Sequence, residues 1–324
     1  MRPAFSVLFL TTLIGAGQGL LIALVCGQLF LVVGTGDASL SGGFYAMGSL
    51  LALVLLALGL LASFFHLANP TRAWRAATQW RTSWLSREVI ALPAVMGMAV
   101  LYGGLHALGW DASLMHFANG KSLDLTMAVG FVTVLACLAL FLCTGMIYAC
   151  VKFIREWHSV WTVINYTLMG LASGFVLAAA YAASLGAVVT GLYAGTGLVL
   201  IVLALAGRAV SLWRNARLKP LATLRGAIGA PHQNIRQVTQ GFNGKSFNTK
   251  EFFHGKSPET VKFLTTFFLA VGFAAPFALV ALGMGSAAVL WLAVMVQYVG
   301  LLAERWVFFA QGNHVQNLYY QRKA

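Results

Sequence analysis

Charged residues are scarce in this sequence. Only 9% of its 324 residues are charged, and only 8 are acidic, whereas a soluble domain carries roughly 25% charged residues. Hydrophobic residues make up 60% of the chain. The composition therefore excludes an ordinary soluble protein and predicts a chain for which lipid is the main solvent.

Cysteine is scarce too. The four cysteines lie inside apolar runs and form no C-x-x-C pair; they are Cys26, Cys137, Cys143 and Cys150. An iron–sulfur cluster needs clustered thiolates, so this chain cannot hold such a cluster alone. We interpret the cysteines as small packing residues and predict no metal site.

Long apolar runs are abundant. A spanning helix needs about 20 mostly apolar residues, and eight segments meet this condition. They are approximately Phe5–Val33, Gly42–Leu67, Val89–Leu108, Leu123–Val151, Val160–Leu185, Val188–Trp213, Val261–Leu282 and Ala287–Ala310. The first run is longer than the apolar part of a signal peptide, roughly 7–15 residues, so we interpret it as a retained helix. The prediction is an all-α, polytopic membrane protein that forms one domain over residues 1–324.

The excess positive charge, formally +13, lies in alternate connections between these segments. The connections after segments two, four and six are basic, whereas those after segments one, five and seven carry no Lys or Arg. This pattern orients a membrane protein and disfavours a nucleic-acid partner. It predicts that the basic loops and both termini face the cytoplasm, in a multi-pass protein of the bacterial inner membrane.

The connection at 214–259 is the only sizeable segment outside the membrane. It is basic and has too few apolar residues to build its own core. A solvated loop is one interpretation, but its phenylalanines favour an arm ordered by a protein partner, because exposed aromatic residues usually find a surface. The residues expected to contact the partner are Phe247, Lys250, Phe252 and Phe253 in the arm, and Arg75 and Arg81 after segment two.

The densest group of ionisable and aromatic residues lies between segments two and three. His66 is one turn from the end of an apolar helix, which Asn69-Pro70 ends, because the residue before proline disfavours the helical region. Ser86 is expected to cap the next helix, with Glu88 in its first turn. One His and one Glu can therefore lie at the same depth on adjacent helices, at the cytoplasmic edge of the lipid.

This pair suits a quinone head group, which offers two oxygens at opposite ends of a ring and takes up two protons with two electrons. A histidine that titrates near neutrality and a carboxylate can bind the oxygens and relay protons. The alternative is that Glu88 only balances the helix dipole and His66 is an ordinary interfacial residue. The residues that could also line a quinone cleft are Ser63, Trp74, Arg87 and Glu304.

The centres of the eight segments carry no ionisable residues, which disfavours a proton pump or an ion channel. Glu304 is expected to pair with Arg305 near the cytoplasmic rim. A b-type haem needs two facing axial ligands; His106 and His116 lie near one surface and His158 and His314 near the other. Because no two histidines match at mid-membrane depth, haem b stays the less favoured alternative.

The stretch F-H-L-A-N-P-T-R-A-W at Phe65–Trp74, followed by L-S-R-E-V at Leu85–Val89, resembles the membrane-anchor subunit of dimethyl sulfoxide reductase. The resemblance implies eight helices and a quinone site at His66 and Glu88 with Arg72. It also implies an iron–sulfur partner subunit and a molybdopterin catalytic subunit, which hold the clusters and the molybdopterin. The chain itself would then carry no catalytic site for the substrate.

Two features distinguish the chain from reductase anchors of that kind. Its His66 and Glu88 lie on the basic, cytoplasmic side, and the stretch at Ser246–Gly255 is similar to the anchors of cytoplasmic sulfite dehydrogenases. We therefore expect a subunit that passes electrons from a cytoplasmic iron–sulfur partner to quinone during sulfite oxidation. The alternatives are the anchor of a dimethyl sulfoxide or polysulfide reductase, a purely structural anchor, and a secondary transporter, for which Pro276 and the glycine-rich first segment are weak signs.

Overall fold

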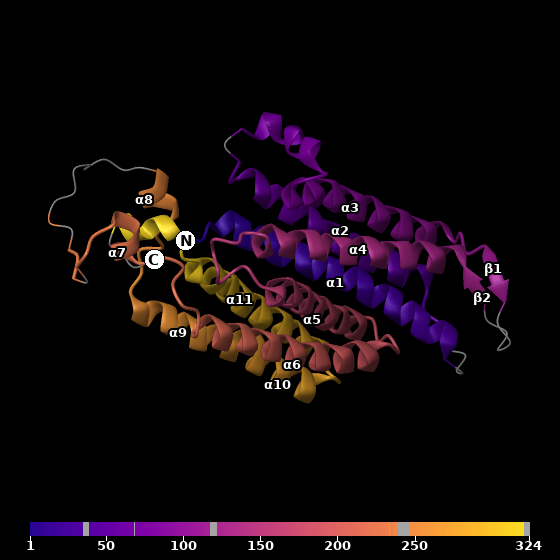
Figure 1. Ribbon diagram of the computed structural model, residues 1–324. Coiled ribbons are helices and arrows are strands. Elements are labelled where there is room, and N and C mark those ends of the chain that lie inside the picture. Colours follow the sequence, from indigo (N-terminus) through magenta and orange to yellow (C-terminus); the bar gives the residue numbers. More distant parts are fainter. Residues whose placement is uncertain are drawn as a thin grey trace.

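The protein is a bundle of long helices that run along one common direction (Figure 1). The computed structural model describes residues 1–34, 39–67, 69–116, 122–232, 234–236, 238 and 247–320. Within these residues, eight helical segments are long and apolar enough to cross a membrane. They are α1 (Phe5–Val33), α2 (Gly42–Phe64), α3 (Trp84–Leu108), α4 (Leu125–Ala149), α5 (Val160–Ser184), α6 (Thr190–Asn215), α9 to α10 (Pro258–Gly283) and α11 (Ala287–Gln311).

These segments confirm the eight predicted from apolar runs, with one informative difference at α3. This helix begins at Trp84, and its N-cap is Ser83, whose hydroxyl accepts a hydrogen bond from the Ser86 N–H. The prediction that Ser86 caps the helix is therefore wrong by three residues. Glu88 is not in the first turn but one position beyond it, on a face that packs inside the protein.

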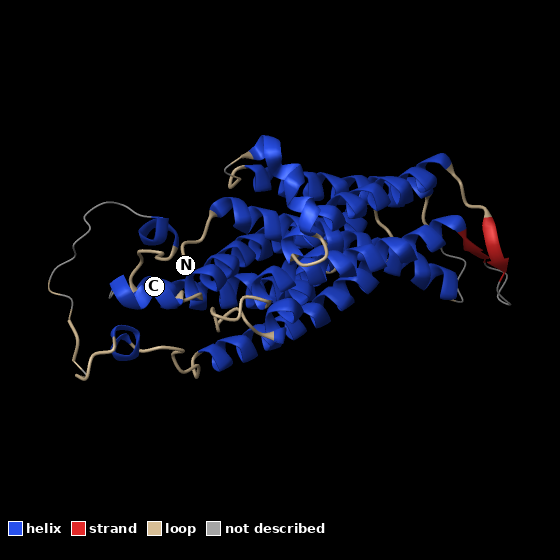
Figure 2. Ribbon diagram, turned by 45° about the horizontal axis from the view of Figure 1, so that its top comes forward, coloured by secondary structure: helices blue, strands red, loops and turns tan. Residues whose placement is uncertain are grey.

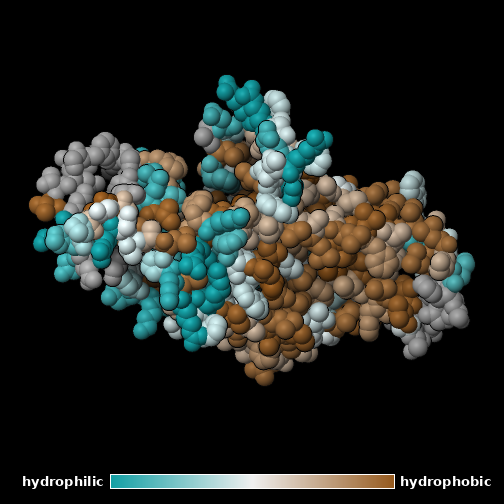
Figure 3. All heavy atoms as spheres, in the orientation of Figure 1, coloured by the Kyte–Doolittle hydropathy of each residue, from teal (hydrophilic) through white to brown (hydrophobic). Residues whose placement is uncertain are grey.

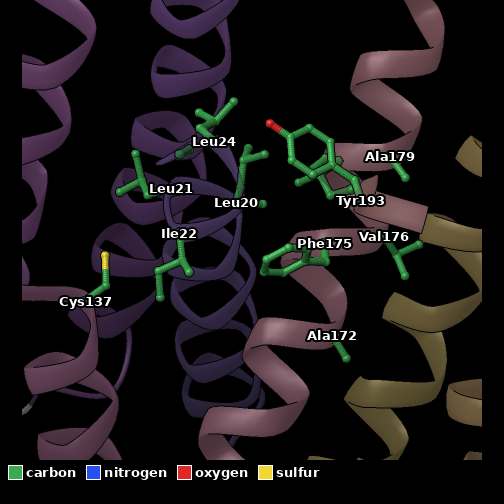
Figure 4. Packing of buried hydrophobic residues seen from close by; sticks show 14 of the residues in the cluster. Leu20, Leu21, Ile22, Leu24, Cys137, Ala172, Phe175, Val176, Ala179 and Tyr193 are labelled. Atoms are coloured by element: carbon green, nitrogen blue, oxygen red, sulfur yellow. The ribbon is translucent and has the colours of Figure 1, made fainter. Parts of the chain in front are cut away.

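Two helices, α1 and α5, form the centre of the bundle. They are much more buried than the other spans, and their apolar side chains meet those of α4 and α6 in one core (Figure 4). Gly15 and Gly19 of α1 lie against Gly170 and Gly174 of α5, and a Cβ on Gly174 would overlap the backbone of Gly19. Glycines four residues apart let membrane helices approach closely, so this contact fixes the centre of the fold.

The seventh span is not a regular helix. α9 (Pro258–Leu269) and α10 (Ala275–Gly283) are joined by a π-helical turn, η2 (Ala270–Ala274). Pro276 follows at the start of α10 and has no N–H to donate. A local π-turn is one way in which a membrane helix accommodates proline, so the span continues to its other end.

The two ends of the bundle differ. One end carries a short antiparallel hairpin of β1 (Ser113–His116) and β2 (Ser122–Asp124), the only strands among the described residues and a small departure from the predicted all-α fold. The other end carries both termini and the short helices η1 (Pro70–Gln79), α7 (Leu224–Ile228), α8 (Phe247–Glu251) and η3 (Val315–Tyr320). Figure 2 shows the two ends. Hydrophilic residues gather at the second end, whereas hydrophobic residues cover the length of the bundle (Figure 3).

The arm between α6 and α9 returns to the bundle through contacts within the chain. The Phe252 ring stacks on His314 with a centroid separation of 4.0 Å, and Asn317 donates to the Phe252 carbonyl at 3.2 Å. The Arg2 N–H donates to the Glu251 carbonyl at 2.8 Å. Both chain ends therefore hold α8 against the end of the bundle.

Candidate functional site

Glu88 is a buried carboxylate on α3, only 7% exposed. Its Oε1 accepts a hydrogen bond of 2.6 Å from the Thr144 hydroxyl of α4. The two residues lie about one turn from the ends of their helices, at the end of the bundle that carries both chain termini. Burial of a carboxylate costs free energy unless hydrogen bonds or opposite charges compensate it. Glu88 has one described hydrogen bond, so its carboxylate can accept a further hydrogen bond from another donor.

His66 lies in the turn that ends α2, and its side chain is exposed. Partial burial lowers the pKa of His66 below the ordinary value of 6.5, so the imidazole is neutral at physiological pH. Arg72 is exposed near the start of η1, where its N–H donates to the Asn69 carbonyl at 3.0 Å. No hydrogen bond or ion pair between described residues joins His66 or Arg72 to Glu88, so their shared quinone site stays a prediction.

The other residues expected near a quinone cleft differ in setting. The Ser63 hydroxyl donates to the Leu60 carbonyl at 2.6 Å, and Trp74 is 66% exposed. Arg87 donates to the carbonyls of Trp80 and Arg81 at 2.9 and 2.8 Å and lies 4.2 Å from the Trp84 ring centroid. Arg87 therefore ties the connection after η1 to the start of α3.

An apolar groove of about 370 Å³ lies between α1 and the second half of α2. Its lining residues are almost all apolar: Ser6, Phe9, Leu13, Leu58, Leu61, Ala62 and Phe65. Phe65, the residue before His66 in the sequence, is the lining residue nearest to the end of α2. A groove of this composition suits a hydrocarbon chain.

Glu304 forms the predicted ion pair with Arg305, at 2.8 Å, but not at an exposed rim. A second cation, Arg208 of α6, lies 2.8 Å from the other Glu304 oxygen. The three side chains are at most 5% exposed, and Arg305 also lies 3.8 Å from the Tyr166 ring centroid. We name Arg208, Glu304 and Arg305 the ion cluster; its net charge is positive.

Sequence reasoning missed Arg208 and Thr144 as partners. The signal for Arg208 was present: a cation inside an apolar span is a functional suspect by default, and Arg208 is seven residues before the end of α6. Thr144 gave no such signal, since threonine hydroxyls in membrane helices commonly bond to their own backbone. Only the packing of α3 against α4 pairs it with Glu88.

The residues expected to bind a partner fall into two groups. Arg75, Arg81, Phe247 and Lys250 are exposed, as a docking role requires. Phe252 and Phe253 are buried at 9% and 8% exposure. These two pack within the chain, and their contact with a partner stays a prediction. Among the described residues, no three His, Cys, Asp or Glu side chains gather as a metal site.

Comparison with known proteins decides the family. The sequence profile of the DMSO reductase anchor subunit (DmsC) family matches residues 2–311. The chain belongs to this family. It is also 50% identical, over 326 residues and the whole of both chains, to a protein of Allochromatium vinosum that is named as a sulfite dehydrogenase subunit. The resemblance drawn from Phe65–Trp74 and Leu85–Val89 is thereby confirmed, and the anchor is favoured over a transporter.

Proposed function

We propose that this chain is the quinone-reactive anchor of a molybdoenzyme complex that oxidises sulfite on the cytoplasmic side of the membrane. An iron–sulfur subunit and a molybdopterin subunit supply the electrons, and the anchor passes them to quinone. The support for the substrate is the full-length identity of 50% to a protein named as a sulfite dehydrogenase subunit. The support for the membrane role is the DMSO reductase anchor family itself.

The sidedness of the proposal rests on charge. The end with both termini carries the exposed arginines of η1 and the basic segment that follows α6, whereas Asp111 and Asp124 lie at the opposite end. Positively charged loops stay in the cytoplasm. Glu88 and His66 therefore face the cytoplasmic leaflet. At that surface Arg75, Arg81, Phe247 and Lys250 are the residues on which a cytoplasmic iron–sulfur protein docks.

One observation carries the quinone site: Glu88 is a buried carboxylate with a single described hydrogen bond, at this end of the bundle. In the proposed site Glu88 holds or gives a proton at one quinone oxygen, and neutral His66 bonds the other. Arg72 lies on the same connection and supplies positive charge near the head group. The apolar groove beside Phe65 accommodates the hydrocarbon tail.

The second candidate is the anchor of a DMSO or polysulfide type reductase, which would oxidise quinol instead. The family assignment favours it as much as the first, since the family takes its name from that reductase. The basic, termini-bearing end is what separates the two. A reductase whose catalytic subunit faces the periplasm needs its partner surface at the hairpin end, which carries β1 and β2.

The test uses the assembled complex in membrane vesicles with Glu88→Gln and His66→Ala variants. We expect sulfite-dependent quinone reduction to fall by about 100-fold for Glu88→Gln, the usual worth of a positioned acid or base. Sulfite oxidation with ferricyanide, which takes electrons upstream of the anchor, should persist. Exposed Glu259→Gln and His116→Ala are matched controls. Wild-type quinone reduction in both site variants of an intact complex would falsify the assignment.

A further inference from the structure

Polar side chains are concentrated inside the bundle between its middle and the end that carries both termini, beyond what a quinone site at Glu88 requires. They come from α1, α4, α5, α6 and α11 and line two small cavities. In each cavity, the volume that the centre of a water molecule can occupy is about 10 Å³. This volume is about enough for one water molecule. The two cavities share Tyr166 and Arg305 as lining residues.

The first cavity shares one lining residue with an open cleft. Its lining includes Asn165, the ion cluster and Glu156. Glu156 belongs to the connection between α4 and α5 and also lines an open cleft of about 900 Å³, together with Arg155 and Lys219. One carboxylate therefore joins the open cleft to the buried cavity.

The second cavity reaches Thr144, the hydrogen-bond partner of Glu88. Its lining includes Gln18 of α1 and Thr144 of α4, besides the shared Tyr166 and Arg305. Thr144 is the residue whose hydroxyl donates to Glu88 at 2.6 Å. The two cavities thus follow one another from Glu156 to the partner of Glu88.

Several buried polar atoms along this line have no hydrogen-bond partner among the described residues. They are the Gln18 Oε1, the Asn165 Oδ1 and an Nη of Arg208. These side chains are 1%, 5% and 2% exposed, and each lines one of the two cavities. Buried polar groups are almost always satisfied, by ordered water where the protein supplies no partner. We therefore expect water in both cavities.

We propose that these residues and their waters form a proton path from Glu156, past Asn165, Tyr166 and the ion cluster, to Thr144 and Glu88. The path rests on the proposed function, since it supplies protons to Glu88 as the donor to quinone. Each quinone reduced takes two electrons from the iron–sulfur subunit and two protons. Glu88 gives up a proton to the quinone, is reprotonated from the path, and delivers the second proton in the same way, so both protons come from the cytoplasm.

The ion cluster lies between the two cavities and holds the residues there in place. Two arginines pair with Glu304 and fix its position, and one of them, Arg305, lines both cavities. Hydroxyl, amide and water groups between the cluster and Glu88 can pass a proton along hydrogen bonds. Asn165 and Tyr166 are positioning residues in this scheme, because neither touches the quinone.

The test measures quinone reduction by the assembled complex in Asn165→Leu and Tyr166→Phe variants. Asn165→Leu fills the first cavity, and Tyr166→Phe removes the hydroxyl but keeps the ring beside Arg305. We expect the kcat to fall about tenfold, as for loss of part of a proton-transfer route, with the KM for quinone unchanged. The solvent deuterium isotope effect on kcat should rise, and ferricyanide-linked activity should stay constant.

Tyr193→Phe is the matched control. Tyr193 is buried like Tyr166, and neither hydroxyl has a described hydrogen-bond partner, but Tyr193 lies near the start of α6, far from the two cavities. Tyr166→Phe decides the outcome if Asn165→Leu fails to assemble. Wild-type kcat, or a lower kcat without a larger isotope effect, overturns the path. If Glu88→Gln loses quinone reduction while both path variants keep it, the path fails alone; if Glu88→Gln keeps it, the proposed function fails.

Discussion

Replacement of Glu304 should lower the stability of the fold strongly. The Glu304→Gln variant keeps the size of the side chain but removes the negative charge between two guanidinium groups. In the native protein each arginine lies 2.8 Å from a different Glu304 oxygen, and all three side chains are nearly inaccessible. The variant leaves two buried cations close together, with no anion between them.

The magnitude follows from the geometry. Opposite charges about 4 Å apart attract by about 4 kcal/mol at an effective dielectric constant near 20. Removing one member of a buried pair costs about 3–5 kcal/mol in measured cases. Since Glu304 serves two arginines, we expect a loss of unfolding free energy at the upper end of that range, and a melting temperature lower by about 10 °C.

The assay is thermal unfolding of the purified chain in detergent, with its abundance in the membrane as a second reading. Arg217→Met is the control, because Arg217 is exposed and its guanidinium lies 3.8 Å from the Trp213 ring centroid in cation–π geometry. The triple variant Arg208→Met, Glu304→Leu, Arg305→Met removes every charge of the ion cluster. It should recover most of the stability that Glu304→Gln loses. A Glu304→Gln protein that melts with the wild type refutes the reasoning.

Three further predictions follow from the fold and the charges. Gly174→Leu should prevent accumulation of the folded chain, because its side chain meets the Gly19 backbone, whereas Gly97→Leu, which meets nothing within 4 Å, should accumulate normally. Because the pKa of His66 is lowered below 6.5, its imidazole is neutral at neutral and alkaline pH, so the KM for quinone should stay constant there and rise in the acid range, a rise that His66→Ala abolishes. During quinone reduction, the complex should take up protons on the side of its catalytic subunits and release none on the other side. With right-side-out vesicles, a pH electrode in the outer medium should therefore record no acidification.

Apolar runs and caps made most of the fold predictable from the sequence. Apolar runs of this length can only cross a membrane as helices. Both ends of α1 and the start of α11 lie at the residues predicted from the runs. The start of α3 was misplaced because Ser83 and Ser86 are both acceptable N-caps, and only the structure shows that Ser83 is the cap. The β1–β2 hairpin was missed because its strands are too short to show alternation.

The setting of the candidate site was predictable in part. The local pattern around His66 and Glu88 singled out both residues, because ionisable groups at the end of an apolar span are unusual. The burial of Glu88 and its bond to Thr144 were not predictable, since they depend on which faces of α3 and α4 meet. The ion cluster joins α6 to α11, about 100 residues apart in sequence, and only the three-dimensional arrangement brings Arg208 to Glu304.

The measurement that tests the account most directly is the sidedness of the end that carries Glu88. Val238 lies in the basic segment after α6 and is 92% exposed, and Met115 lies in the opposite hairpin and is 60% exposed. In a Cys150→Ser background, Val238→Cys and Met115→Cys variants are treated in spheroplasts with a maleimide that cannot cross membranes. We expect labelling of Met115→Cys and none of Val238→Cys. Labelling of Val238→Cys from outside would place the quinone site and its partners in the periplasm and contradict it.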